Sequence, residues 1–200
     1  MNVWISSDHH LGEDRFSLMQ RPFSSIDEHN NCIIENHNKL VGVNDTVYFN
    51  GDVLYQKGDI EANINLISQI NGKKILIRGN HDRPISDEQF APYFEQIVPE
   101  GKGVELEVGG ISCYVTHYPT RAMEAKFNLV GHIHAAWKFQ LNSMNVGVDV
   151  NHFSPLNLDS IPFFVKAITE FYDEDVWVAY RPENASYRET RGKKDVYFKD

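Results

Sequence analysis

Short apolar runs along the chain alternate with longer stretches in which apolar residues recur every three or four positions. The short runs are rich in β-branched and aromatic residues, which is the pattern of buried strands. They predict strands at Val3–Ser6, Thr46–Phe49, Lys74–Arg78, Ser112–Thr116 and Asn128–Val130. Because strands that alternate with helices are typical of α/β proteins, the order predicts an α/β fold without internal repeats.

Two of the longer stretches predict amphipathic helices. The first begins near Ser25, which has Glu28 three residues on, the spacing of a capping box. Its apolar positions are Ile26, Cys32, Ile33 and Leu40. The second begins near Asp59 and ends at Gly72, and it carries Ile60, Ile64, Ile67 and Ile70 on one face. Both apolar faces are predicted to pack into the core.

Two hairpins are predicted in the second half of the chain. Gly109-Gly110 can adopt the positive backbone angles of a tight turn between Val104–Val108 and Ile111–Val115. Asn142-Ser143 is the predicted turn between Trp137–Leu141 and Met144–Val148.

The last part of the chain has a weaker pattern. A helix is predicted over Leu158–Thr169 and a strand over Val176–Tyr180, followed from Arg181 by a charge-rich tail. We expect that tail to be partly disordered or packed on a partner. Residues 1–200 are predicted to form one domain, in which 159–200 is a C-terminal extension of open role.

The composition is that of an ordinary globular protein, with 42% hydrophobic and 24% charged residues in 200. No apolar run approaches the roughly 18 residues of a membrane-spanning helix, and the first residues lack the basic and apolar regions of a secretory signal. A cytoplasmic protein without membrane contact is therefore expected. Cys32 and Cys113 are far apart in the sequence and are expected to be free thiols.

The formal net charge is −9, from 19 basic and 28 acidic residues. This balance disfavours loose electrostatic binding to long nucleic acid, for which basic patches normally supply the affinity. It does not oppose a small phosphorylated substrate, because bound metal ions would reverse the local potential.

Polar residues with metal-ligand chemistry follow five of the predicted strands. They are Asp8 and His10, then Asp52, then Asn80 with His81 and Asp82, then His117, and finally His132 and His134. In α/β sheets, ligands bind beyond the carboxyl ends of the strands, so these five ends are expected to converge.

Taken singly, most of these blocks have an ordinary structural explanation. Asp8-His9-His10 alone is compatible with a helix cap beside two surface imidazoles, and Gly51-Asp52 alone with a turn. His132 and His134 alone would fit a strand edge with alternating polar residues. The five blocks together, in this order and at strand ends, favour a metal site.

The ordered blocks resemble those of the calcineurin-like metallophosphoesterases, namely Asp-x-His, Gly-Asp, Gly-Asn-His-(Asp/Glu), His and Gly-His-x-His, over residues 8–134. The chain is also similar to a smaller bacterial and phage subgroup through Arg21-Pro22-Phe23 and through residues 145–149, followed by Pro155. Relatives often have His where Glu13 stands, which leaves the role of the loop around Glu13 open. The resemblance implies two packed mixed β-sheets flanked by helices.

The resemblance also implies a set of ligands for two divalent ions. Asp8, His10 and His134 would hold the first ion, Asn80, His117 and His132 the second, and Asp52 would bridge the two. Oxygen and imidazole ligands suit several metals, and we expect Mn²⁺, with Fe²⁺, Ni²⁺ or Zn²⁺ as alternatives. Such a pair of ions lowers the pKa of a bridging water and creates hydroxide at neutral pH.

His81 is expected to act as the general acid, as its family counterpart does, with Asp82 orienting its imidazole. The alternative makes His81 a metal ligand and Asp82 a cap. Arg83 and Arg121 are candidate phosphate-binding residues, and Tyr118 and Trp137 are candidates for stacking on a base. For these four residues, surface or core packing remains an equal alternative.

These observations predict a phosphoesterase that hydrolyses a phosphodiester or phosphomonoester, with a nucleotide-type substrate. Two further activities stay open: a nuclease and a nucleoside-polyphosphate pyrophosphatase. A scaffold without catalysis is another class of function, but such scaffolds usually lose ligands or the His of the Asn-His-Asp block, and this chain retains them all. The oligomeric state is left open.

Overall fold

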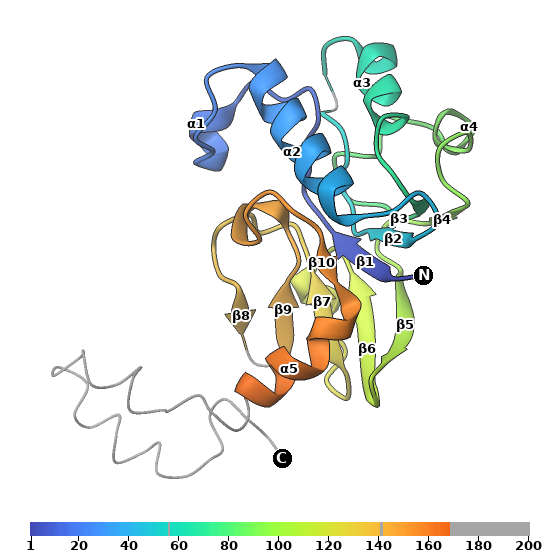
Figure 1. Ribbon diagram of the computed structural model, residues 1–200, viewed down its shortest axis with the longest axis vertical. Helices are drawn as coiled ribbons and strands as arrows, with labels where there is room; N and C mark the ends of the chain where they lie inside the picture. The colour runs from blue at the N-terminus through green and yellow to red at the C-terminus, as the bar shows by residue number, and fades with distance from the viewer. Residues whose placement is uncertain (56, 141, 169–200) are drawn as a thin grey trace, which may run out of the picture.

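Two five-stranded mixed β-sheets pack together in the computed structural model, and helices flank them (Figure 1). The structure describes residues 1–55, 57–140 and 142–168. The predicted strand at Val176–Tyr180 and the tail from Arg181 lie outside these residues. The predicted arrangement of two mixed sheets with flanking helices is confirmed.

The first sheet has the strand order β10-β1-β2-β3-β4. Strands β1 to β4 are parallel to their neighbours, and β10 pairs with β1 in the antiparallel sense. The bounds are β10 Leu156–Asn157, β1 Val3–Ser6, β2 Thr46–Phe49, β3 Lys73–Ile77 and β4 Gln96–Val98. The sequence pattern predicted β1 and β2 to the residue and β3 to within one, but it missed the short β4 and β10.

The second sheet has the order β5-β6-β7-β9-β8. The central strands β6, β7 and β9 run parallel, and the outer strands β5 and β8 are antiparallel to their neighbours. The bounds are β5 Gly103–Val108, β6 Ile111–Thr116, β7 Phe127–Val130, β9 Ser143–Asn145 and β8 Phe139–Gln140.

The two predicted hairpins have different outcomes. The first is confirmed, because Val108 pairs with Ile111 and both Gly109 and Gly110 have positive φ, of 56° and 84°. In the second, Gln140 pairs with Ser143, so Ser143 belongs to strand β9 and not to the turn. The predicted position of that turn was wrong, because register in such short strands is weakly specified.

The strands of the first sheet are buried on both faces. On β1, Trp4 belongs to a hydrophobic cluster shared with the helices, whereas the next residue, Ile5, packs into the cluster between the two sheets. On β3, Leu76 likewise packs into the cluster with the helices, and Ile77 packs into the cluster between the sheets. Alternation of successive side chains across a strand therefore explains the continuous apolar runs in the sequence.

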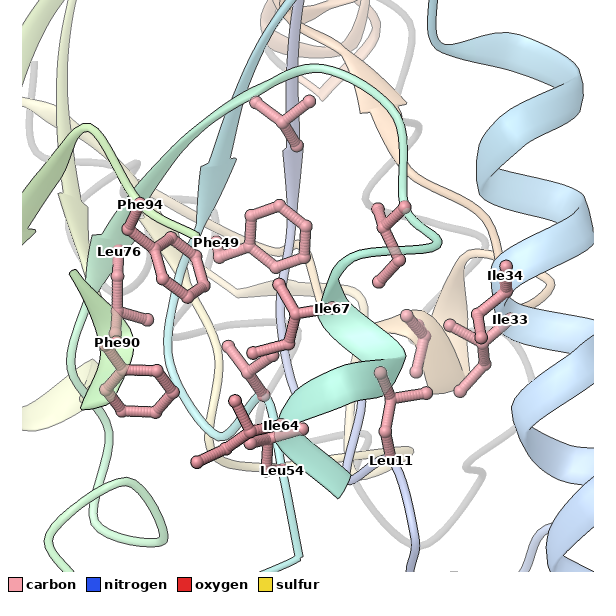
Figure 2. Packing of buried hydrophobic residues seen from close by; sticks show 14 of the residues in the cluster. Leu11, Ile33, Ile34, Phe49, Leu54, Ile64, Ile67, Leu76, Phe90 and Phe94 are labelled. Atoms are coloured by element: carbon pink, nitrogen blue, oxygen red, sulfur yellow. The ribbon is translucent and has the colours of Figure 1, made fainter. Parts of the chain in front are cut away.

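Helices α2, Ile26–Leu40, and α3, Ile60–Ile67, pack on this first sheet. Figure 2 shows Ile64 and Ile67 of α3 near Leu54 and Phe49, with Ile33 and Ile34 of α2 on the other side of the cluster. The remaining helices are α1 Phe16–Met19, α4 Asp87–Phe90 and α5 Ile161–Lys166, with 3-10 turns at Pro119–Arg121, Val148–Val150 and Leu158–Ser160.

The predicted helix starts are confirmed more closely than the ends. Ser25 and Asp59 are the N-caps, and their side chains accept hydrogen bonds from the backbone amides of Glu28 and Ala62. The reciprocal half of the capping box is absent, because the Glu28 carboxylate bonds Ser24 instead. Helix α3 ends at Ile67, not at Gly72, since a turn over residues 68–70 leads the chain toward β3.

The predicted helix over Leu158–Thr169 starts as a 3-10 turn and becomes α5 at Ile161. Phe164 of α5 packs on Phe139 of β8, with ring centroids 5.7 Å apart. Cys32 and Cys113 are free thiols, as expected. Among the described residues, no helix is long and apolar enough to cross a membrane.

Candidate metal centre

The blocks that follow the strands meet where the two sheets come together. Asp8 and His10 follow β1, Asp52 follows β2 and Asn80 follows β3, all in the first sheet. His117 follows β6, and His132 and His134 follow β7, in the second sheet. Asp52 joins the two sets, because its Oδ2 atom lies 3.8 Å from Nε2 of His10 and 3.3 Å from Nε2 of His117. The expected convergence is therefore observed.

Five of these residues have left-handed backbone conformations. The φ angles are 59° at Asp8, 52° at His10, 54° at Asp52, 74° at His132 and 47° at His134. Residues other than glycine rarely adopt this region, and each such residue costs on the order of 1–3 kcal/mol unless its surroundings compensate. Backbone bonds provide part of that compensation, since the amides of Asp8 and His10 donate to the carbonyls of Gly51 and Asp52, both at 3.0 Å.

Close backbone approach also shapes the centre. A Cβ atom at Gly79 would lie 2.2 Å from Oδ1 of Asp52, so the position has no room for a side chain. The amide of His81 donates to the same Oδ1 atom at 2.8 Å. The block after β3 is thereby held against the carboxylate at the end of β2.

Three groups of side chains place ligand atoms within 4.8 Å of one another and could each hold a metal ion. They are Asp8, His10 and His134; His10, Asp52 and His81; and Asp52, His117 and His132. Four of the residues are buried: Asp8, His10, Asp52 and His117. Asp52 belongs to two groups, which is the position that a carboxylate shared by two ions would need.

Several buried polar atoms at the centre lack a hydrogen-bond partner among the described residues. Both ring nitrogens of His10 and the Oδ1 atom of Asn80 are such atoms. Unpaired buried polar groups are costly, and native proteins rarely keep them without a ligand or water. Two carboxylates beside unpartnered imidazole and amide atoms form a donor set that fits divalent cations.

His117 carries the electrostatic signature of the same site. Its Nδ1 atom lies 2.7 Å from the carbonyl oxygen of Asn50, so the ring presents Nε2 to Asp52. Burial lowers the pKa of His117, but contact with Asp52 and the charges of Asp8 and Asp52 raise it to about 9. The two carboxylates thus stabilise a positive charge beside them, which either a proton or a metal cation can supply.

A buried network behind His134 was not assigned a role from the sequence. Nδ1 of His134 lies 2.9 Å from Oδ2 of Asp149, and Arg21 donates to both oxygens of that carboxylate, at 2.7 and 2.9 Å. Arg21 also donates to the backbone carbonyls of Asp8 and His9, at 2.5 and 2.8 Å. The segments around Arg21 and Asp149, which are similar to those of the bacterial and phage subgroup, were the only features of the sequence that pointed to this network.

The buried carboxylate of Asp82 makes no hydrogen bond to the His81 imidazole in the described structure. It accepts hydrogen bonds from the backbone amides of Gly79 at 2.8 Å, Asp52 at 2.9 Å and Val53 at 3.1 Å. Nδ1 of His81 has no hydrogen-bond partner in the described structure. Asp82 therefore fixes the strand ends after β2 and β3, and its expected role in orienting the His81 imidazole stays a prediction.

The loop around Glu13 has a self-contained structure. The buried carboxylate of Glu13 accepts hydrogen bonds from the backbone amide of Arg15 at 3.0 Å and from its guanidinium, with both contacts at 2.7 Å. This pair holds the loop that follows His10 in place through contacts within the loop itself.

An open cleft of about 560 Å³ adjoins the centre at Asn80 and His132. Three of the predicted substrate contacts line it, Arg83, Tyr118 and Arg121, whereas Trp137 does not. Glu100, which was not predicted, also lines it and bonds both Arg83 and Tyr118. It was missed because it follows β4, the strand that the hydrophobic pattern did not predict.

Comparison with known proteins adds a family match. The model of the calcineurin-like phosphoesterase family matches residues 1–130. The chain is 30% identical to the uncharacterized protein MJ1445 of Methanocaldococcus jannaschii over 170 residues, 80% of this chain and 88% of that protein. It is 36% identical to the Gene 66 protein of Mycobacterium phage L5 over 85 residues, 42% of this chain and 41% of that protein.

The fold is also found among solved structures. The crystal structure of the protein of unknown function AQ665 from Aquifex aeolicus matches with a TM-score of 0.64. The match covers 82% of this chain and 98% of that chain, at 21% sequence identity. At this identity the likeness concerns the fold alone.

Proposed function

Because the chain belongs to the calcineurin-like phosphoesterase family, we propose that it is a two-metal phosphoesterase acting on a phosphodiester or phosphomonoester of nucleotide type. The observation that carries this proposal is the position of Asp52. One oxygen of this buried carboxylate faces an imidazole from each sheet, His10 at 3.8 Å and His117 at 3.3 Å. No other arrangement in the described structure offers one carboxylate to two histidine sets.

The proposed ligand sets use two of the three side-chain groups and add Asn80, whose Oδ1 atom lacks a hydrogen-bond partner among the described residues. Asp8, His10 and His134 would hold one ion, and Asn80, His117 and His132 would hold the other, with Asp52 shared. Bound divalent ions would supply Lewis acidity to the phosphoryl group and activate water at neutral pH. We expect Mn²⁺ as the first choice, with Fe²⁺, Ni²⁺ or Zn²⁺ as alternatives, because the donor set alone does not select among them.

Side chains of the protein are proposed to position the metal ligands and to protonate the substrate. Asp82 holds the backbone of Asp52 and Gly79 in place, and the His81 amide holds Oδ1 of Asp52. The His81 ring lies edge-on to His10, with centroids 4.8 Å apart, so it stands next to the proposed reaction site. We propose that this imidazole protonates the leaving oxygen of the substrate.

A specific observation keeps a second role for His81 open. His81 belongs to one of the three groups with metal-binding spacing, together with His10 and Asp52. In that role it would be a ligand, and leaving-group protonation would need another donor. The variants His81→Ala and His117→Ala distinguish the two roles through their metal content and leaving-group dependence.

The substrate is proposed to be a small phosphorylated molecule. The net charge of −9 opposes long nucleic acid, whereas the cleft of about 560 Å³ beside Asn80 and His132 has the size of a small-molecule site. A nuclease is the second candidate, because that cleft is open at the surface. Degradation of single-stranded DNA under multiple turnover would favour the nuclease.

The test is metal removal and restoration. Protein treated with EDTA and verified by elemental analysis is assayed with p-nitrophenyl phosphate, bis-p-nitrophenyl phosphate, cyclic nucleotides and short single-stranded DNA. We expect no turnover without metal and recovery with Mn²⁺, at two ions per chain. Full activity of verified metal-free protein would overturn the proposal, and recovery with another divalent ion would change only the metal.

A further inference from the structure

Glu100 lies in the turn that carries the chain from one sheet to the other. Residues 99–102 connect β4 of the first sheet to β5 of the second, closed by a bond from the Lys102 amide to the Pro99 carbonyl at 3.1 Å. Because β4 runs parallel to β3, with Ile77 opposite Val98, the residues that follow both strands leave the sheet side by side. Glu100 is thereby placed next to the block that contains Asn80 and Arg83.

Two cleft residues donate hydrogen bonds to the Glu100 carboxylate. Arg83 donates to it through Nε at 2.6 Å and through Nη2 at 2.5 Å, a bidentate ion pair. The Tyr118 hydroxyl donates to the same carboxylate. Hydrogen bonds from Arg83 and Tyr118 outweigh burial and lower the pKa of Glu100 to about 2, so the group stays charged.

Through Tyr118, Glu100 is connected to two of the proposed metal ligands. The Tyr118 ring packs edge-on against His117 and His132, with both centroid distances at 4.9 Å. Glu100, Asn80 and His132 line one cleft. The carboxylate therefore adds a fixed negative charge to the wall of the cleft that adjoins the centre.

The two arginines of the cleft differ in availability. Two N–H groups of Arg83 are occupied by Glu100, and the pair has no net charge. The side chain of Arg121 is exposed and has no hydrogen bond or ion pair within the described residues. Arg83 keeps N–H groups that can still bind a phosphate, but Glu100 neutralises its charge, whereas the charge of Arg121 is not paired within the described residues.

We propose that Glu100 is a specificity-determining residue that favours singly charged phosphodiesters over doubly charged phosphomonoesters. A monoester is largely a dianion above its second pKa of about 6, whereas a diester carries one charge. Glu100 disfavours the dianion in two ways, since it neutralises the charge of Arg83 and it repels the extra charge. This inference rests on the proposed function and specifies the substrate class of that site.

The decisive comparison uses two variants that break one ion pair from opposite sides. Glu100→Gln removes the negative charge and releases Arg83, but it keeps an oxygen that can accept from Tyr118. Arg83→Gln leaves the carboxylate without its counter-charge. If charge determines the preference, the first variant raises the monoester-to-diester ratio of kcat/KM and the second lowers it. A purely structural role of the pair would move both ratios in the same direction.

The assay uses the Mn²⁺-loaded full-length chain at pH 8, with p-nitrophenyl phosphate and bis-p-nitrophenyl phosphate. We expect Glu100→Gln to raise the ratio about tenfold, mainly through KM, as one charge interaction at moderate screening can produce. Glu105→Gln is the matched control, because the Glu105 carboxylate also forms an ion pair, with Lys126 at 2.7 Å, but does not line the cleft. Its ratio should equal that of the unmodified protein.

A binding measurement separates this inference from the proposed function. Calorimetric titration of the same variants with methyl phosphate and dimethyl phosphate reports the charge preference without turnover. If the unmodified protein hydrolyses neither ester but the affinity ratio shifts in opposite directions in the two variants, the proposed activity fails and the inference stands. Unchanged ratios in both variants, or shifts in the same direction, would overturn the role of Glu100.

Discussion

Asp149 accepts a hydrogen bond from Nδ1 of His134, at 2.9 Å, which leaves Nε2 of the ring to face Asp8 and His10. The carboxylate is in turn held by the side chain of Arg21, which is fully buried. Carboxylates that bond the second nitrogen of a metal-binding histidine fix its tautomer and orientation. Arg21 and Asp149 are 128 positions apart in the sequence, and together they support His134, a proposed metal ligand.

Asp149→Asn is predicted to weaken metal binding without removing any ligand. The amide cannot supply the charge that holds both the His134 ring and the Arg21 guanidinium, so the ring loses its fixed orientation. The expected loss is about 10- to 100-fold in affinity for the ion at Asp8, His10 and His134. Titration of the metal-free protein with Mn²⁺ measures it. The exposed Asp159→Asn is the control, and equal affinities in the two variants would contradict the assignment.

Asp52→Asn is predicted to abolish hydrolysis while the fold is retained. An asparagine can still accept the 2.8 Å bond from the His81 amide, but it lacks the charge that offsets repulsion between two cations. Turnover should fall to the background of the assay, and elemental analysis should find fewer than two ions per chain. Circular dichroism checks the fold. Normal turnover at unchanged metal content would remove the two-ion model.

The sequence was most informative where one local pattern decides the outcome. Val3–Ser6 and Thr46–Phe49 were predicted to the residue, because β-branched and aromatic runs between polar turns have few alternatives. The convergence of Asp8, Asp52 and His117 was predicted from their place after such strands. Parallel strands bring Asp8 and Asp52 to one edge of the first sheet, whereas His117 joins them because the second sheet packs against the first.

The sequence was least informative where long-range pairing decides the outcome. Strand β4 has only three residues and forms because Ile77 and its neighbours in β3 provide a pairing edge. No local pattern therefore predicted this strand, or the position of Glu100 just after it. The direction of the Asp82 carboxylate is equally non-local, since its three partners are backbone amides of two strand ends. Residue type predicted that Asp82 belongs to the site, but not which atoms it contacts.

The stability of the metal-free protein is predicted to fall as pH decreases from about 6.5 to about 4. Burial of His37 on α2 lowers its pKa to about 4, against a bond to the Asn71 carbonyl at 3.0 Å. In that range the unfolded chain binds a proton that the folded chain does not, so unfolding becomes more favourable. The loss is at most about 3 kcal/mol for this group, complete below pH 4.

His37→Gln isolates this contribution, because glutamine can donate to the same carbonyl and does not titrate. Urea unfolding in EDTA at pH 7, 6, 5 and 4 should show a shallower loss of the free energy of unfolding than in the unmodified protein. His152→Asn, which removes an exposed imidazole, should retain the original slope. Parallel slopes for the unmodified protein and His37→Gln would show that His37 does not carry the dependence.

His81→Ala is predicted to affect substrates according to their leaving groups. A p-nitrophenolate departs readily without a proton, whereas the alkoxide of a sugar does not. If His81 is the proton donor, the variant should slow a nucleoside or alkyl ester by about 10²- to 10⁴-fold and an activated aryl ester far less. Its metal content should stay near two ions per chain.

His117→Ala provides the contrast, because His117 is a proposed ligand whose Nε2 lies 3.3 Å from the shared carboxylate. This variant should lose metal and slow both kinds of ester alike. The same assays therefore distinguish the two roles of His81, whose ring lies 4.8 Å from that of His10 and within metal-binding distance of Asp52. If His81→Ala slows both esters equally and loses an ion, His81 is a ligand, and the proton must reach the leaving group from elsewhere.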